Sequence, residues 1–360
     1  MIKTKVSHLK RDRLLAVTKH PYFAFLAFGA AMMILMFLSS IGILQYSFAA
    51  SLTFTLIYSM VAIGFSYLLG YAGLASLGTA GFVGLGAYIA SFMMQTGVQQ
   101  GIIPFEIPYV FILIIALLVS VGLGVVVGFI SLRIEGIFLA IVTLGLSEVL
   151  YQLFLNWIPI TGGPNGMTVL RFPVIFGDLR LDRLSMMLIV AAFMTLLLIL
   201  TYNLGKSQTG RAMLAMKNST SAAQAMGISL LKYRLLAFVL ATAYAGLAGA
   251  LLMGFSRYTD PYSWTLMFSL QILAACIFGG TRSLFGIIFG TFIVLGIVPM
   301  FLQNVEYLRN NSWLFNVIIG VVLILIVLFY RGGVMQLFRD IRKFFTSIRR
   351  RLWVRKYGND

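Results

Sequence analysis

Long runs of apolar residues, separated by short polar segments, follow one another along most of the chain. A helix of about 20 residues, at roughly 1.5 Å per residue, crosses a hydrocarbon core of about 30 Å. We expect ten such spans, all helical, because a helix satisfies its own backbone groups in lipid. The expected spans are approximately 21–44, 47–70, 74–95, 108–131, 137–158, 184–204, 234–256, 264–280, 284–303 and 313–330. The pattern therefore predicts an all-α polytopic integral membrane protein.

Two glycine clusters interrupt this pattern. Residues 64–86 hold seven glycines, and residues 279–290 hold four. Glycine permits close approach of two helices, but it also permits the broken or re-entrant backbone that lines a transport path. Both interpretations, glycine-broken segments and close packing alone, stay open at this point.

Composition and charge agree with a membrane location. The chain is 60% hydrophobic and only 10% charged, whereas a soluble domain carries about 25% charged residues. Its net charge of +17 does not indicate nucleic-acid binding, because of where the charges lie. If successive loops are placed on alternate sides of the membrane, 22 of the 27 lysines and arginines fall on one side. The positive-inside rule makes that side cytoplasmic, and it holds both termini. Membrane lipid is thus an expected partner, with the basic tail lying against an anionic leaflet.

The polar segments divide the chain into parts. We distinguish a basic cytoplasmic N-terminal segment 1–20, a transmembrane domain 21–330 and a basic cytoplasmic tail 331–360. No small-residue cleavage site follows the first apolar run, so we interpret it as a retained span. Two longer loops stand out, an outer loop 159–183 and a cytoplasmic loop 205–234.

The cytoplasmic loop has too regular a pattern for a simple linker. Apolar residues recur on both sides of the polar stretch 218–221, which can supply an N-cap to a second short helix. Gly227 can end that helix. We expect two short helices at the membrane surface, with small residues exposed for docking into a groove on a partner.

The residues needed for most enzyme chemistry are missing. The two histidines, His8 and His20, both lie in the N-terminal segment, and no phosphate-binding lysine loop is present. The lone Cys276 reads as a small buried hydrophobe, so we expect no disulfide, no metal site and no catalytic residues. Glu148 lies in the middle of an apolar span, where a carboxylate costs a few kcal/mol unless it is paired or hydrated. It either supports packing or lines a path. Glu135, beside Arg133, is expected to form an interfacial ion pair.

A series of short motifs runs in order along most of residues 50–333. They are GYAGLASLG at 70–78, GLGAY at 84–88, GIFLAIVTL at 136–144 followed by Glu148, TGGPNG at 161–166, GRA at 210–212, AAQAMGI at 222–228, AGLAGA at 245–250 and GGTRSLFG at 279–286. Together these motifs resemble one family, the branched-chain amino acid ABC transporter permeases, and the LivM-type subunit in particular.

The resemblance implies a transport subunit without an ATPase site of its own. It implies a second permease subunit, two ATP-binding cassette subunits that hold ATP and Mg²⁺, and an extracytoplasmic substrate-binding protein, in a bacterial inner membrane. The coupling residues it implies are Gly210, Arg211, Ala222, Ala223 and Gly227. Ser221 stands where the family usually has Glu, which puts one charged contact to the ATPase in doubt.

The glycine clusters and nearby hydroxyls suggest where a substrate passes. A zwitterionic head group needs backbone groups, hydroxyls or helix ends in a low-dielectric region. The residues expected along the path are Gly73, Ser76, Gly78, Thr79, Thr143 and Glu148. The motif at 161–166 favours amino acids over urea. Permeases for urea, amides or sugars, and a stand-alone secondary transporter, are the alternatives, and a membrane-embedded enzyme ranks behind them.

Overall fold

The computed structural model describes residues 21–96, 107–131, 137–170, 172–176 and 179–297, together with six positions between 314 and 324. The predictions for the N-terminal segment 1–20, the Arg133–Glu135 pair and the tail 331–360 lie outside the described residues. The predicted span 313–330 is described at those six positions only.

Six helices of the described part are long and apolar enough to cross a membrane, so the chain is a multi-pass membrane protein. They correspond to six of the predicted spans. Their bounds are α2 (Pro21–Ser40), α3 (Tyr46–Ser66, continued by the π-helical segment η1, Tyr67–Ala72), α6 (Tyr109–Ser131), α7 (Ile137–Asn156), α9 (Arg183–Lys206) and α12 (Leu230–Ser256).

The remaining apolar helices are shorter. Helix α4 (Thr79–Ser91) continues into η2 (Phe92–Thr96), and α13 (Leu266–Gly279) is followed by α14 (Leu284–Thr291) and η5 (Phe292–Ile297). The prediction of a continuous span 74–95 was wrong at its start, because residues 73–78 are not helical. The span predicted over 264–280 begins in a 3₁₀ turn, η4 (Pro261–Trp264).

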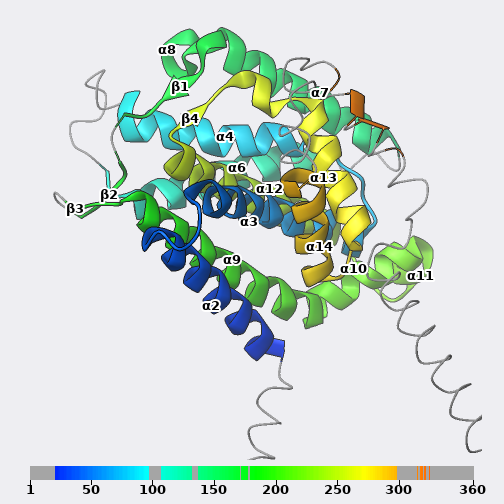
Figure 1. Cartoon of the computed structure of the whole chain (residues 1–360). Coiled ribbons are helices and arrows are strands. Elements are labelled where there is room, and N and C mark those ends of the chain that lie inside the picture. The colour runs from blue at the N-terminus through cyan, green and yellow to red at the C-terminus, as the bar shows by residue number, and fades with distance from the viewer. Residues whose placement is uncertain are drawn as a thin grey trace, which may run out of the picture.

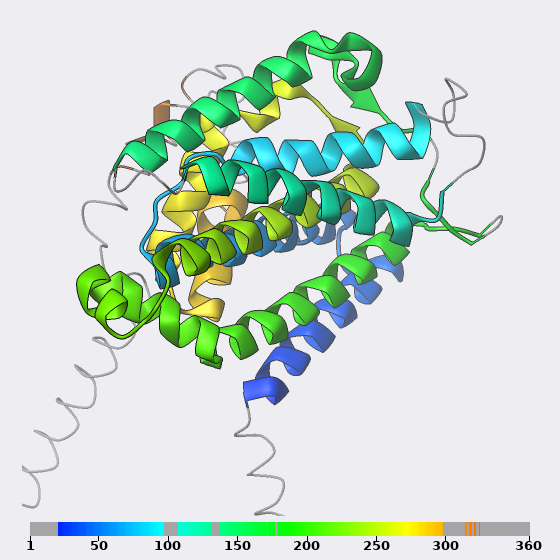
Figure 2. The same cartoon turned by 180° about the vertical axis from the view of Figure 1, so that it is seen from behind.

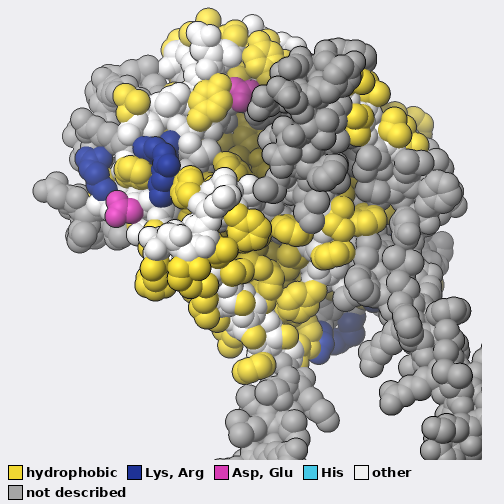
Figure 3. Space-filling model, viewed as in Figure 1, with side chains coloured by type: hydrophobic (Ala, Val, Ile, Leu, Met, Phe, Trp, Pro, Cys, Tyr) yellow, Lys and Arg dark blue, Asp and Glu magenta, His cyan; other side chains and the backbone are white. Residues whose placement is uncertain are grey.

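Helix α12 lies at the centre of the bundle, packed against α3, α4 and α6 (Figures 1 and 2). In α12, 72% of the span is buried, against 28% of α6, so α6 is a peripheral helix. Its outward residues, such as Val126 and Phe129, are apolar and exposed, as expected of a lipid-facing side. Figure 3 shows apolar side chains over much of the described surface, with lysines and arginines gathered near its ends.

Some glycines serve close packing. A Cβ on Gly86 of α4 would collide with the carbonyl of Gly246 in α12, and one on Gly249 would collide with the carbonyl of Val83. The two helices therefore approach backbone to backbone, as small residues allow between membrane helices. Both interpretations of the glycine clusters apply, at different residues.

The loop predicted over 159–183 takes part in two small antiparallel β pairs. Strand β1 (Met167–Thr168) pairs with β4 (Tyr258–Thr259), and β2 (Val174–Phe176) pairs with β3 (Leu179–Arg180). The β1–β4 pair fastens the outer loop to the segment after α12. Strand β1 follows α8 (Ile158–Thr161) and η3 (Gly163–Asn165). The glycines of the TGGPNG motif take positive φ there and form the turns.

The loop predicted over 205–234 contains the two predicted short helices, α10 (Gln208–Asn218) and α11 (Thr220–Ala225). Ser219 Oγ accepts a hydrogen bond from the Ala222 amide, 3.2 Å, which confirms the predicted N-cap. Gly227, at φ 77°, ends α11, and the Ile228 amide donates to the Ala223 carbonyl as in a Schellman turn. The loop is shorter than predicted, since α12 already begins at Leu230.

Candidate functional site

The site begins where the first glycine cluster breaks a helix. Segment η1 ends at Ala72, and Gly73 takes φ 73°, a left-handed conformation that side chains other than glycine rarely adopt. The Leu74 amide donates to the Leu68 carbonyl, 2.8 Å, which closes the helix end. The backbone then runs without helix to Gly78, the residue before α4. We call residues 73–78 the break.

Hydroxyls from other helices satisfy the backbone at the far end of the break. The Leu77 amide donates to Thr143 Oγ1 of α7, 2.9 Å, and the Ala80 amide donates to Ser269 Oγ of α13, 2.9 Å. A Cβ on Gly78 would lie 2.8 Å from the Thr143 carbonyl, so α7 and the break approach as closely as glycine permits. Thr143 thus positions the break, and the first turn of α4 is anchored from two sides.

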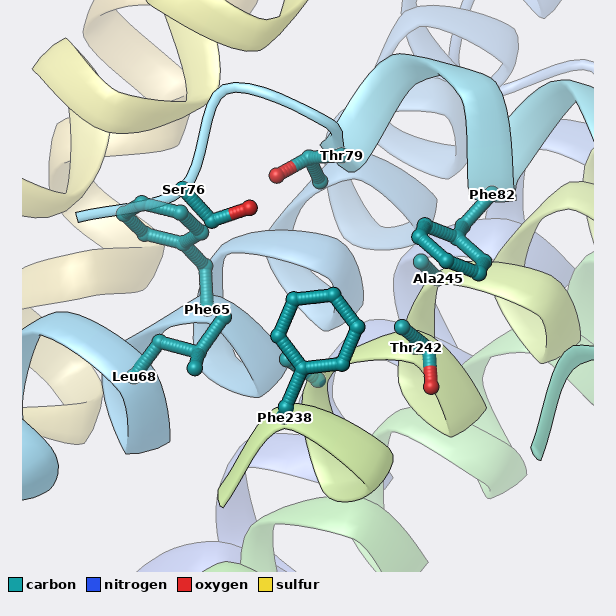
Figure 4. A pocket seen from close by; sticks show the side chains of 9 residues that line it. Phe65, Leu68, Ser76, Thr79, Phe82, Phe238, Thr242 and Ala245 are labelled. Carbon is teal, nitrogen blue, oxygen red and sulfur yellow. The ribbon is translucent and has the colours of Figure 1, made fainter. Parts of the chain in front are cut away.

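A small cavity lies beside the break (Figure 4). Its volume is about 10 Å³, room for roughly one water molecule. Aromatic and aliphatic side chains of three helices enclose it, and the hydroxyls of Ser76 and Thr79 point toward one another at its edge. The lining residues are Phe65, Leu68, Ser76, Thr79, Phe82, Phe238, Ala241, Thr242 and Ala245. The cavity is therefore too small to hold an amino acid.

The predicted path residues do not all lie here. Ser76 and Thr79 line the cavity, while Gly73, Gly78 and Thr143 shape or hold the break. Glu148 lies apart from it, on an exposed face of α7.

Glu148 heads a polar row on the exposed face of α7. Gln152 Nε2 donates to Glu148 Oε1, 3.0 Å, and Asn156 Nδ2 donates to Gln152 Oε1, 3.2 Å. The three residues are spaced four apart, so they share one side of α7. We call them the α7 polar stripe. Among the described residues, no lysine or arginine forms an ion pair with Glu148.

Three residues at or near the break were not predicted from the sequence: Thr242 in the cavity wall, Ser269 and Lys217. The hydroxyls of Thr242 and Ser269 sit in apolar helices, and nothing local distinguishes them from residues that bond to their own helix. Lys217 belongs to the amphipathic helix α10 and looked like an ordinary surface lysine. Only the tertiary arrangement brings it against η1.

The predicted coupling residues take different places around α10 and α11. Gly210 lies in the first turn of α10, where a Cβ would stand 2.5 Å from the Leu204 carbonyl at the end of α9. Arg211 is exposed and donates to the Lys206 carbonyl, 2.8 Å. Ala222 and Gly227 are exposed, whereas Ala223 is buried and packs inward.

An open groove runs beside α11. Its volume is about 530 Å³, and Met226 at its margin exposes 83% of its surface. The lining residues are Gln224, Gly227, Ile228, Ser229, Leu230, Leu231 and Arg234.

The part of the chain that the structure describes holds no group of three metal-ligating side chains, and Cys276 is a buried free cysteine. A membrane bundle with a broken helix, a small internal cavity and a pair of short helices outside the spans is the arrangement expected of a transport subunit of the permease class. The chain belongs to the family described as branched-chain amino acid transport system / permease component, which matches residues 47–327. The resemblance seen in the motifs is thereby confirmed.

Individual relatives agree with this family. The high-affinity branched-chain amino acid transport system permease proteins LivM of Salmonella typhimurium and Escherichia coli are each 28% identical over 310 residues, 80% of this chain and 69% of theirs. The autoinducer 2 import system permease protein LsrC of Yersinia enterocolitica is 30% identical over 222 residues, 59% of this chain and 58% of its own. No solved structure matches the chain.

Proposed function

We propose that this chain is the membrane-spanning permease subunit of a bacterial ATP-driven importer for branched-chain or related amino acids, in the cytoplasmic (inner) membrane. The observation that carries the proposal is that α10, beside the open groove, packs directly against η1, which leads into the break and the cavity. A cytoplasmic docking element and a transport path are thus joined within one chain of the permease family.

The cavity lining suits this substrate class. Phe65, Leu68 and Phe238 offer an apolar wall for a branched side chain. The hydroxyls of Ser76 and Thr79, and the backbone of the break, offer polar partners for the ammonium and carboxylate. The present volume of the cavity excludes any amino acid. Transport therefore requires that the cavity widen along the break when the transporter changes its conformation.

We assign ten spans to the full chain, with both termini in the cytoplasm. Six long and three shorter apolar helices of the described residues, with the apolar stretch 313–330, supply that number. The outer β pairs lie at the opposite end of the bundle from α10 and α11 (Figure 1), which agrees with the sides assigned from charge.

The α7 polar stripe supports a second permease subunit as partner. A carboxylate facing lipid near the middle of a span costs about 2.5–3.5 kcal/mol. The exposed stripe is therefore expected to face protein or a hydrated path between two permease subunits rather than lipid. A substrate-binding protein is expected to deliver substrate to the outer loop, where Leu170 is 72% exposed.

Two ATP-binding cassette subunits, which would hold ATP and Mg²⁺, are the proposed partners of α11 and its groove. Replacing Gly227 by valine tests this, because its left-handed φ strains a β-branched residue by about 1–3 kcal/mol and moves the end of α11. We expect Gly227→Val to lose co-purification with the ATPase subunits. The control is Gly122→Val, at an exposed glycine of α6 with open space around it. Full retention of the ATPase by Gly227→Val would overturn the docking assignment.

A second candidate function has support from the LsrC relatives, which are permease proteins of the autoinducer 2 import system. Three hydroxyls around the cavity could also receive a small hydroxylated molecule. Competition for uptake by leucine, autoinducer 2, urea and a simple sugar separates these substrates, and leucine is expected to compete best.

A further inference from the structure

Lys217 makes a contact that neither the motifs nor the family assignment singles out. It lies in the last turn of α10, and its side chain reaches across to η1. Its Nζ donates to the Leu69 carbonyl, 3.0 Å, and to the Gly70 carbonyl, 2.9 Å. The contact joins residues 147 and 148 positions apart, from the cytoplasmic helix pair to the helix that enters the break.

The two carbonyls need such a partner. At the end of a helix the last carbonyls have no intrahelical donor, and the reversal at Gly73 supplies amides only to Leu68. An ammonium is well suited to the negative end of the helix dipole. Lys217 therefore completes the hydrogen bonding of η1 at its last turn.

The surroundings leave η1 little freedom to move independently of this lysine. A Cβ on Gly73 would lie 3.0 Å from Lys217 Cγ, so the lysine stem runs along the break itself. On another side, a Cβ on Gly70 would collide with the carbonyl of Thr281, in the turn between α13 and α14. Partial burial lowers the pKa of Lys217, and the neighbouring Arg282 guanidinium lowers it further. Arg282 is thus a second cation close to this helix end.

We propose that Lys217 is a positioning residue that transmits movement of α10 to the break, so that displacement of the cytoplasmic helices shifts Ser76 and Thr79 at the cavity. The connection is short, because Ser76 follows Gly70 by six residues and no helix intervenes after Ala72. This role rests on the proposed function, since it requires a partner ATPase to move α10.

The test uses the complete transporter, with both permeases, the ATPase subunits and the binding protein, in proteoliposomes. Lys217→Met keeps the length of the side chain but removes the donor. We expect its uptake to fall at least about tenfold while the ATPase subunits stay bound and continue to hydrolyse ATP. Lys217→Arg, which can reach the same carbonyls, is expected to keep more than half of the uptake. Lys232→Met is the control, at an exposed lysine of α12.

A second measurement separates transmission from folding. In a Cys276→Ala background, a cysteine replacing Ser76 is labelled with a thiol reagent, with and without ATP. ATP is expected to change the labelling rate when Lys217 is present and to leave it unchanged in Lys217→Met.

The outcomes are distinct. Uptake by Lys217→Met at the level of the unmodified complex would overturn the role of Lys217 and leave the proposed function intact. Loss of the ATPase subunits from Lys217→Met would also overturn it, since the residue would then serve assembly. Failure of the unmodified complex to take up substrate with ATP would instead overturn the proposed function.

Discussion

Thr143 shows how one hydroxyl can hold a non-helical segment inside a membrane bundle. Its Oγ1 accepts from the Leu77 amide, 2.9 Å, and donates to the Ala140 carbonyl of its own helix, 3.0 Å. The break therefore depends on a donor–acceptor chain that crosses between two helices. In lipid, no water replaces a partner that is lost.

Thr143→Val keeps the shape of the side chain and leaves the Leu77 amide without its acceptor. We expect a loss of about 1–3 kcal/mol, seen as a lower thermal unfolding temperature in detergent, together with reduced uptake. The matched control is Thr53→Val, because the buried Thr53 hydroxyl bonds only to the Ala49 carbonyl of its own helix, 2.8 Å. Equal shifts for the two variants would contradict the role given to Thr143.

The sequence predicted part of this site at the residue scale. Ser76, Gly78 and Thr79 could be proposed as residues of a broken helix because a glycine cluster with nearby hydroxyls is a local pattern. Glu148 was recognised as unusual, but two interpretations were open since periodicity alone does not show which side of α7 faces the bundle. Lys217 was missed because its partners are carbonyls almost 150 residues away, and backbone carbonyls have no sequence signature.

At the scale of elements, long apolar runs predicted six spanning helices well. The errors fall where glycine changes the backbone, since hydropathy continues through residues 73–78 although the helix does not. The caps of α10 and α11 were predictable from serine and glycine, whose local bonds decide helix ends. The β1–β4 pair was not, because its strands are far apart in the sequence and only two residues long.

The α7 polar stripe gives an element-scale prediction about the second permease subunit. In a Cys276→Ala background, a photoactivatable thiol reagent on Gln152→Cys is expected to cross-link the partner permease. The same reagent on Val126→Cys, on the apolar and exposed side of α6, is expected to give no such product. Equal cross-linking from both positions, or none from Gln152→Cys in an intact complex, would contradict the assignment of the stripe.

At the scale of the whole molecule, the structure connects two ends of one bundle. Strands β1 and β4 fasten the loop 159–183, an open groove lies beside α11, and α10 packs against η1, which leads into the break. In the proposed transporter, partner ATPase subunits would move this bundle from the groove beside α11.

Uptake of radiolabelled leucine into proteoliposomes shows whether this chain transports amino acids only as part of an ATP-driven complex. Proteoliposomes with the full complex of this chain, a second permease subunit, the ATPase subunits and the binding protein are compared with those holding this chain alone. We expect leucine to accumulate only in proteoliposomes that hold the complex, and only with ATP and Mg²⁺ on the cytoplasmic side. Leucine accumulation by the chain alone, or by the complex without ATP, would contradict it.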